Sequence, residues 1–170
     1  PRVHNHQTGE REPVRRVLPE AARIARGPVV PLGSFSLDGV DALVIPGGFG
    51  AATILCDYAE KGSGCTVNPE VERLVADARA LGIPVAAMCI APVILARCIP
   101  GVTLTVGSRS DTALPMEAMG AVTRECDTDQ AVVDVENRVV TTPAYMTATG
   151  PLEVFRGAER MVEGINSLLQ

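Results

Sequence analysis

The stretch Ile83-Pro-Val-Ala-Ala-Met-Cys-Ile-Ala-Pro-Val-Ile94 decides the fold of this 170-residue chain. Its first six residues, up to Met88, carry no charge, which is typical of a strand covered on both faces. Pro92 stands where the first turn of a helix tolerates proline, because the N–H groups of that turn have no partner within the helix. The pattern predicts a buried strand, a sharp turn at Cys89 and a helix.

Cys89 is the candidate nucleophile. At the carboxyl end of a parallel strand its thiol would face the N–H groups of the following helix, and the positive end of a helix dipole favours a thiolate over a thiol. This arrangement is the cysteine version of a nucleophile elbow. A cysteine between apolar residues also occurs as a small buried hydrophobe, so the local pattern alone leaves both interpretations open.

A second stretch favours the functional interpretation of Cys89. It is Asp41-Ala-Leu-Val-Ile-Pro-Gly-Gly-Phe-Gly50, an apolar strand that runs into a glycine-rich turn. Such a turn leaves backbone N–H groups free to face an oxyanion. A thiol at one strand end and free donors at another are complementary parts of one catalytic site.

The composition limits the class of protein. With 46% apolar and 21% charged residues, the chain is globular and long enough for one domain, residues 1–170, with a sizeable core. A net charge of −5 without a basic cluster, and the lack of tryptophan, argue against a nucleic-acid partner. No apolar run has the length of a membrane span, and the polar start of the chain does not resemble a signal peptide.

The cysteines indicate the compartment. Five of them, an odd number without a C-x-x-C spacing, argue against a disulfide framework and a zinc site. We therefore expect a cytoplasmic protein that holds no metal and no cofactor. Besides Cys89, the cysteines are Cys56, Cys65, Cys98 and Cys126.

Periodicity and capping residues predict an alternation of strands and helices. After an irregular start over 1–12, helices are expected over residues 13–26, 51–59, 69–81, 111–119 and 151–169, and in the segment between Cys89 and residue 98. Strands are expected over 28–32, 41–45, 83–88, 102–106, 131–134 and 138–141. This order predicts an α/β three-layer sandwich, a mostly parallel sheet with helices on both faces. Ligands of such folds bind at the carboxyl ends of the strands.

Four runs of the sequence together carry a resemblance that covers nearly the whole chain. They are Pro46-Gly-Gly-Phe-Gly-Ala-Ala52, Cys65-Thr-Val67, Met88-Cys-Ile-Ala-Pro92 and Val140-Thr-Thr-Pro-Ala-Tyr-Met146. In this combination the chain resembles the ThiJ/PfpI superfamily, whose flavodoxin-like fold is that of class I glutamine amidotransferases. It resembles most the ElbB group, glyoxalase-like proteins once linked to isoprenoid biosynthesis.

The resemblance implies a function for the elbow. Cys89 would be the nucleophile, and the backbone N–H groups of Gly48 and Ile90 would form the oxyanion pocket. The substrate would be a small carbonyl compound such as glyoxal, converted to a hydroxy acid without metal or glutathione. Homodimers are common in the superfamily, so a homodimer is expected as well.

Six further residues are expected to line the pocket: Gly47, Phe49, Cys65, Thr142, Pro143 and Tyr145. Cys65 lies in a loop that either folds over the pocket as a second redox cysteine or only packs. Thr142, Pro143 and Tyr145 leave a strand end, where lining the pocket and simple packing are both open. The remaining cysteines are expected to pack.

Two catalytic parts of the relatives have no counterpart in this sequence. The resemblance implies a glutamate on the helix after the family's first strand, and the chain is expected to lack that first β-α-β segment. The only histidines are His4 and His6, in a polar segment ahead of every expected strand. Glutaminase activity, which needs a histidine base, is therefore not expected. A non-enzymatic thiol sensor, with Cys89 oxidised reversibly, is the alternative to the enzyme.

Overall fold

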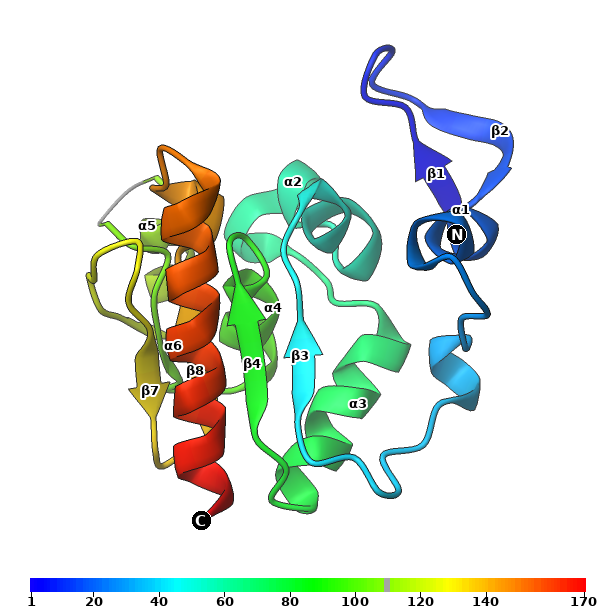
Figure 1. Ribbon diagram of the computed structural model, residues 1–170. Coiled ribbons are helices and arrows are strands. Elements are labelled where there is room, and N and C mark those ends of the chain that lie inside the picture. The colour runs from blue at the N-terminus through cyan, green and yellow to red at the C-terminus, as the bar shows by residue number, and fades with distance from the viewer. Residues whose placement is uncertain (109–110) are drawn as a thin grey trace. The chain divides into compact units, whose positions relative to one another are not determined.

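The computed structural model describes residues 1–108 and 111–170 (Figure 1). The chain divides into two compact units, Pro1–Ser36 and Leu37–Gln170. The first is a small N-terminal unit and the second is the α/β unit, and each is described by itself.

Three predictions for the N-terminal unit are wrong. Strand β1 (Arg2–His4) pairs antiparallel with β2 (Arg11–Arg16), where an irregular start and the first helical turn were expected. Pro13 lies within β2, and an edge strand tolerates a residue without an N–H group. Helix α1 (Val17–Ala25) therefore begins four residues later than predicted, with its proline in the first turn. The strand predicted over 28–32 is not formed, and a single 3-10 turn, Leu32–Ser34, follows that region.

The α/β unit is organised around a four-stranded sheet in the order β3-β4-β8-β7. Strands β3, β4 and β8 are parallel, and β7 is antiparallel to β8. The mostly parallel sheet predicted from the sequence is thus confirmed. The bounds are Leu43–Ile45 for β3, Val85–Met88 for β4, Val132–Asp134 for β7 and Val139–Thr142 for β8. A separate parallel pair consists of β5 (Thr103–Leu104) and β6 (Val122–Thr123).

Helices cover both faces of the sheet, which confirms the three-layer sandwich. Figure 1 shows α6 in front of β8, with α3 and α4 on the other side of the sheet. The helices are α2 (Tyr58–Lys61), α3 (Pro69–Ala80), α4 (Pro92–Cys98), α5 (Ala113–Ala118) and α6 (Pro151–Leu169), with shorter turns at Ala51–Leu55, Gly62–Gly64 and Ala144–Met146. None of the helices in the described ranges is long and apolar enough to cross a membrane.

One predicted helix is interrupted. The helix expected over 51–59 is a π-helical turn, Ala51–Leu55, followed by the separate α2. Between them Cys56 is extended and forms an antiparallel bridge with Val67. The pairing with a segment distant in sequence overrides the local preference for helix.

Close packing of α6 on the sheet explains the glycine at position 164 of that helix. A core cluster joins Ala86 and Val140 of the sheet to Met161, Ile165 and Leu168 of the helix. A Cβ atom on Gly164 would lie 2.9 Å from Val140 Cγ1. Only glycine allows the helix to approach the sheet this closely.

Asp134 ties the β7–β8 turn to β5. Its buried carboxylate accepts hydrogen bonds from the backbone N–H of Thr103 at 2.6 Å and from the N–H and side-chain amide of Asn137 at 3.0 and 2.9 Å. Burial acts to raise the pKa of Asp134, but these donors outweigh it and hold the pKa below its ordinary value. The ionised carboxylate is therefore a structural element.

We expect Asp134→Asn to lower the free energy of unfolding by about 3 kcal/mol at pH 7, because an amide loses charge-assisted hydrogen bonds. Because the pKa of Asp134 is lower in the folded state than in the unfolded state, its ionisation stabilises the fold at pH values above the unfolded-state pKa of about 3.9. This contribution is lost as the pH falls through the folded-state pKa. Urea unfolding at pH 7 and pH 3 measures both effects. Glu136→Gln, at an exposed side chain of the same turn, is the control. A variant whose stability deficit is the same at both pH values would contradict this role.

Candidate active site

Cys89 lies on the sharp turn that the sequence predicts. It follows β4 directly and adopts φ 60°, a left-handed conformation that is uncommon for a residue with a side chain. Its N–H donates to the carbonyl of Thr142 at 3.1 Å, and the chain enters α4 at Pro92. Strained, left-handed residues cluster at functional sites, and this geometry presents the half-buried thiol at the carboxyl end of the parallel strands.

The glycine-rich turn after β3 lies directly against this elbow. A Cβ atom on Gly47 would be 2.4 Å from Cys89 Cβ, 2.8 Å from the carbonyl oxygen of Met88 and 3.2 Å from Cys89 Sγ. The parallel register of β3 and β4, which pairs Ile45 with Ala87, brings the two turns together. Only glycine fits at position 47.

Two backbone donors flank this contact. Gly48 follows Gly47 with φ 91°, and Ile90 follows Cys89. In the described part of the α/β unit neither N–H group donates a hydrogen bond to the protein. Free N–H groups next to a thiol are the parts from which an oxyanion pocket is built.

The thiol of Cys89 has no acid or base as a hydrogen-bond partner within the described α/β unit. No carboxylate or imidazole side chain of that unit forms a hydrogen bond with Cys89 Sγ. His4 and His6 belong to the N-terminal unit, where their rings pack edge to face with centroids 5.3 Å apart. The site geometry therefore places a thiol beside two free backbone N–H groups.

The other residues expected to line the pocket take different places. Thr142 binds Cys89 through its backbone carbonyl, while its buried hydroxyl donates to the carbonyl of Gln130 at 2.7 Å. Pro143 lies beside Gly107, at 3.0 Å from where a Cβ atom would be. Tyr145 is 62% exposed and Phe49 is 48% exposed.

Cys65 is fully buried, and it contacts Met119 and Arg97. Its Sγ lies 3.9 Å from Met119 Sδ, and its carbonyl accepts from Arg97 Nε at 3.0 Å. No group of three His, Cys, Asp or Glu side chains among the described residues has the geometry to hold a metal ion.

Burial affects the acidity of four other thiols. It raises the pKa of Cys56 and of Cys98 to about 11 each, and it also raises the pKa values of Cys65 and Cys126. All four are therefore protonated near neutral pH, and protonated thiols are poor nucleophiles.

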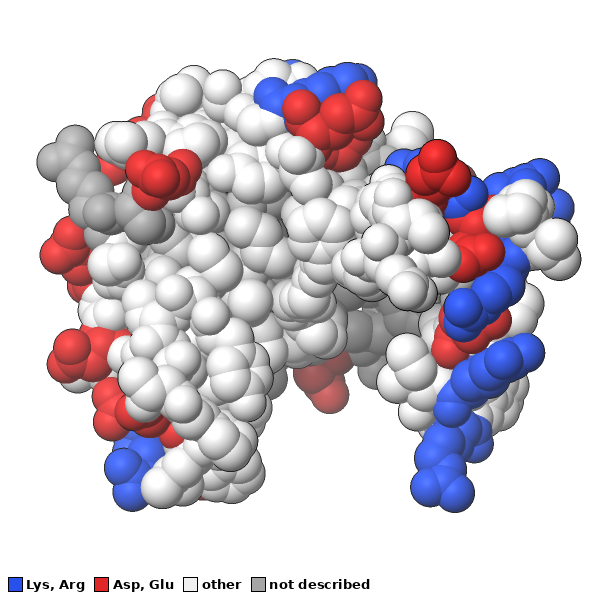
Figure 2. Space-filling model, turned by 90° about the horizontal axis from the view of Figure 1, so that it is seen from above, with Lys and Arg blue, Asp and Glu red and all other residues white. Residues whose placement is uncertain are grey.

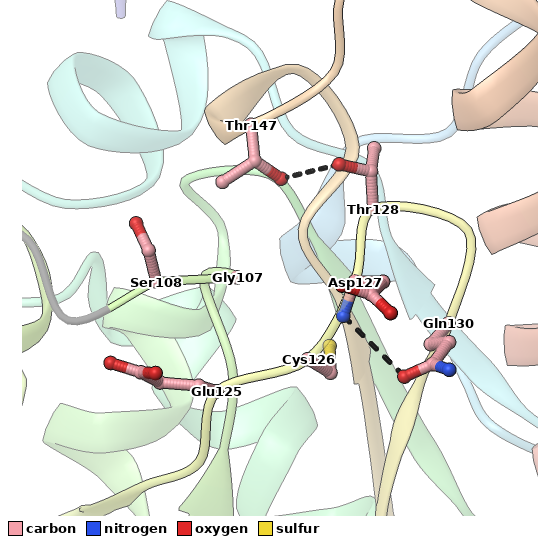
Figure 3. A pocket seen from close by; sticks show the side chains of 8 residues that line it. All are labelled: Gly107, Ser108, Glu125, Cys126, Asp127, Thr128, Gln130 and Thr147. Carbon is pink, nitrogen blue, oxygen red and sulfur yellow. Dashed lines mark hydrogen bonds between the residues drawn. The ribbon is translucent and has the colours of Figure 1, made fainter.

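A polar cavity of about 560 Å³ is formed by the loops that follow β5, β6 and β8 (Figure 3). The sequence analysis missed it, because its walls come from three loops that are distant in sequence. Gly107 with φ 95° connects it to the elbow region, because this glycine also touches Pro143. The hydroxyls of Thr128 and Thr147 lie 2.8 Å apart at its edge. The lining residues are Gly107, Ser108, Glu125, Cys126, Asp127, Thr128, Gln130 and Thr147.

Known proteins resemble the chain along most of its length. No family model matches it. The human protein named glutamine amidotransferase-like class 1 domain-containing protein 3, mitochondrial, is 40% identical over 163 residues, which cover 91% of this chain and 61% of the human protein. The rat protein named ES1 protein homolog, mitochondrial, is 39% identical, with coverage of 99% and 68%. The chain belongs to this ES1 family of glutamine amidotransferase-like proteins.

Solved structures agree with the family's fold. An isoprenoid biosynthesis protein with an amidotransferase-like domain from Ehrlichia chaffeensis superposes with a TM-score of 0.83 at 29% identity, covering 98% of this chain and 78% of that one. Drosophila melanogaster DJ-1beta superposes with a TM-score of 0.50 at 21% identity, covering 83% and 72%, which shows the fold alone. The predicted family resemblance and the α/β, flavodoxin-like fold class are confirmed.

The predicted cytoplasmic location is wrong. The human and rat relatives are named as mitochondrial proteins, and so is the zebrafish ES1 protein, which is 26% identical over 79% of this chain. The prediction rested on unpaired cysteines, which indicate a reducing compartment and do not distinguish one such compartment from another.

Proposed function

We propose that this ES1 family member is a cofactor-independent enzyme that converts glyoxal or a related dicarbonyl to a hydroxy acid, with Cys89 as its nucleophile. The observation that carries the proposal is the elbow, in which the left-handed Cys89 packs on Gly47 between two free backbone donors. Figure 2 looks onto the face at the carboxyl ends of the strands. Over the α/β unit that face is largely uncharged, which suits a small neutral substrate.

The chemistry needs no external oxidant. The thiolate of Cys89 forms a C–S bond with one aldehyde carbon, and the resulting oxyanion accepts hydrogen bonds from the N–H groups of Gly48 and Ile90. A base then moves the proton of that carbon to the second carbon, which oxidises the first and reduces the other. The product is a glycolyl thioester. Water cleaves its C–S bond, releasing glycolate and the free thiol.

The proton transfer is the step that this elbow leaves to another group. The family resemblance implies a glutamate as the base. Within the described α/β unit, no carboxylate forms a hydrogen bond with the thiol.

The test is glycolate formation from glyoxal, with a chelator present and glutathione absent. We expect many molecules of glycolate per protein chain, because the thiol is regenerated in each cycle. Glycolate that never exceeds the amount of protein would contradict an enzyme.

A thiol sensor is the second candidate, favoured by the lack of an acid or base partner at Cys89 within the described α/β unit. Since burial raises the pKa values of the other four thiols, oxidation by peroxide would concentrate at Cys89, giving a sulfenic acid and water. This candidate predicts no catalytic glycolate in the same assay.

A further inference from the structure

A cavity of about 410 Å³ lies at the opposite edge of the sheet from the Cys89 elbow. The elbow follows the carboxyl end of β4, whereas this cavity lies where the parallel strands β4 and β8 begin (Figure 1). Its walls come from the C-terminal part of α3, from Ile83 before β4, and from the turn between β7 and β8. Arg79 and Arg138 both line it, and we call it the arginine cavity.

The two arginines of this cavity form no ion pair with any carboxylate in residues 1–108 and 111–170. They lack an acidic partner even though acidic residues outnumber basic ones in the chain by 20 to 15. Glu136 is the one carboxylate among the described lining residues, and its side chain is exposed. Two like charges in one cavity repel each other, so an anion between them lowers the electrostatic energy of the site.

Arg138 is held in place but keeps one donor without a partner. Its backbone is left-handed with φ 54°, and its carbonyl accepts the N–H of Val85 at 3.0 Å. Its Nη2 donates to the carbonyl of Leu168 at the end of α6. Its Nε is buried and donates no hydrogen bond. Such a donor costs about as much free energy as a lost hydrogen bond, and a bound water or ion accounts for many of these groups in native proteins.

Arg79 lines the same cavity from α3. Its Nη2 lies 3.5 Å from Asn137 Oδ1, a long hydrogen bond, while the amide and the backbone N–H of Asn137 both donate to Asp134. A positive charge in the last turn of a helix offsets the negative end of the helix dipole, which explains the position of Arg79. A guanidinium group carries five N–H donors, so this role leaves most of them available in an exposed side chain.

We propose that the arginine cavity binds one small oxyanion, a carboxylate or a phosphate group, between Arg79 and Arg138. The planar fork of a guanidinium group matches the paired oxygen atoms of either anion, and such charge-assisted hydrogen bonds are stronger than neutral ones. The rest of the lining includes the apolar side chains of Ala76, Ala80 and Ile83. These provide contact for a short carbon chain attached to the anion, as in a small organic acid or phosphate ester.

The test is an NMR titration of the ¹⁵N-labelled protein with sodium phosphate and, separately, with sodium acetate, followed at the Nε–H groups of the arginines. Sodium chloride keeps the ionic strength constant, and a slightly acidic pH slows the exchange of these protons. The variants Arg79→Gln, Arg138→Gln and Arg156→Gln assign the signals. We expect the signals of Arg79 and Arg138 to shift with one common dissociation constant. The signal of Arg156, exposed on α6 outside the cavity, should not follow that curve.

Two of these variants also make the result specific. Arg79→Gln changes an exposed side chain, so it should fold, and it should weaken anion binding at the Arg138 signal by at least about tenfold. Arg156→Gln removes the same charge elsewhere and should leave the dissociation constant unchanged. Saturation by phosphate, by acetate or by both identifies the anion that the cavity accepts. Saturation by neither, or equal dissociation constants in the Arg79→Gln and Arg156→Gln proteins, would overturn the proposal. Neither outcome bears on glyoxal turnover.

Discussion

Replacing Cys89 with serine is expected to lower glycolate formation from glyoxal by about a thousandfold or more. The hydroxyl of serine stays protonated near neutral pH and lacks a base partner within the described α/β unit, so the C–S bond-forming step has no effective replacement. Serine fits the same left-handed turn, because only the sulfur is exchanged for oxygen. The loss should therefore appear in kcat with an unchanged thermal midpoint.

Cys126→Ser is the matched control for this variant. Cys126 is a thiol of the same α/β unit, but burial raises its pKa and it lines the polar cavity. We expect it to keep the turnover of the unsubstituted protein. Turnover in Cys89→Ser as fast as in Cys126→Ser would remove Cys89 from the reaction.

Gly47→Ala should lower turnover by about a hundredfold while the cysteine itself is intact. The new Cβ atom would stand 2.4 Å from Cys89 Cβ and 2.8 Å from the carbonyl oxygen of Met88. Real atoms do not approach this closely, so the elbow must shift by a sizeable fraction of an ångström. A misplacement of about 1 Å can cost a hundredfold in rate. We also expect a stability loss of about 1–3 kcal/mol from the overpacking.

Gly50→Ala is the control that distinguishes a distortion of the elbow from the effect of replacing any glycine of this turn. This residue lies in the same turn, has φ −61°, and has no atoms within 4 Å of an added Cβ. Its turnover and thermal midpoint should match those of the unsubstituted protein. Equal turnover in Gly47→Ala and Gly50→Ala would show that the contact with the elbow does not matter.

The elbow was predictable because its signals are local. The uncharged strand before Cys89 and the proline at position 92 specify the strand, the turn and the helix within a dozen consecutive residues. Helix α6 (Pro151–Leu169) agrees with its prediction for the same reason, since its apolar face repeats through many turns.

The N-terminal unit shows where this reasoning fails. Pro13 has the same appearance as a proline at a helix start, yet it lies in β2, which is held by pairing Arg2 with Arg16. Such a contact joins residues distant in sequence, and no local pattern reports it. The extended Cys56, bridged to Val67, escaped prediction for the same reason.

The candidate site was also predictable only where its signals are local. Gly47 and Cys89 were predictable from two strand-end motifs, and their contact follows from the parallel register. For Cys65 the sequence left a place over the pocket and simple packing both open, and its sulfur faces Met119 at the end of α5. The polar cavity at Gly107 depends on how three loops meet, which the sequence does not encode in one place.

The most direct test of the central claim is the rate of iodoacetamide alkylation at each cysteine near neutral pH, measured by peptide mass spectrometry. The account predicts that Cys89 is modified first. The other four thiols should react slowly, because burial raises their pKa values, to about 11 for Cys56 and Cys98. Alkylation of Cys89 no faster than that of the other four thiols would contradict a nucleophile at the elbow.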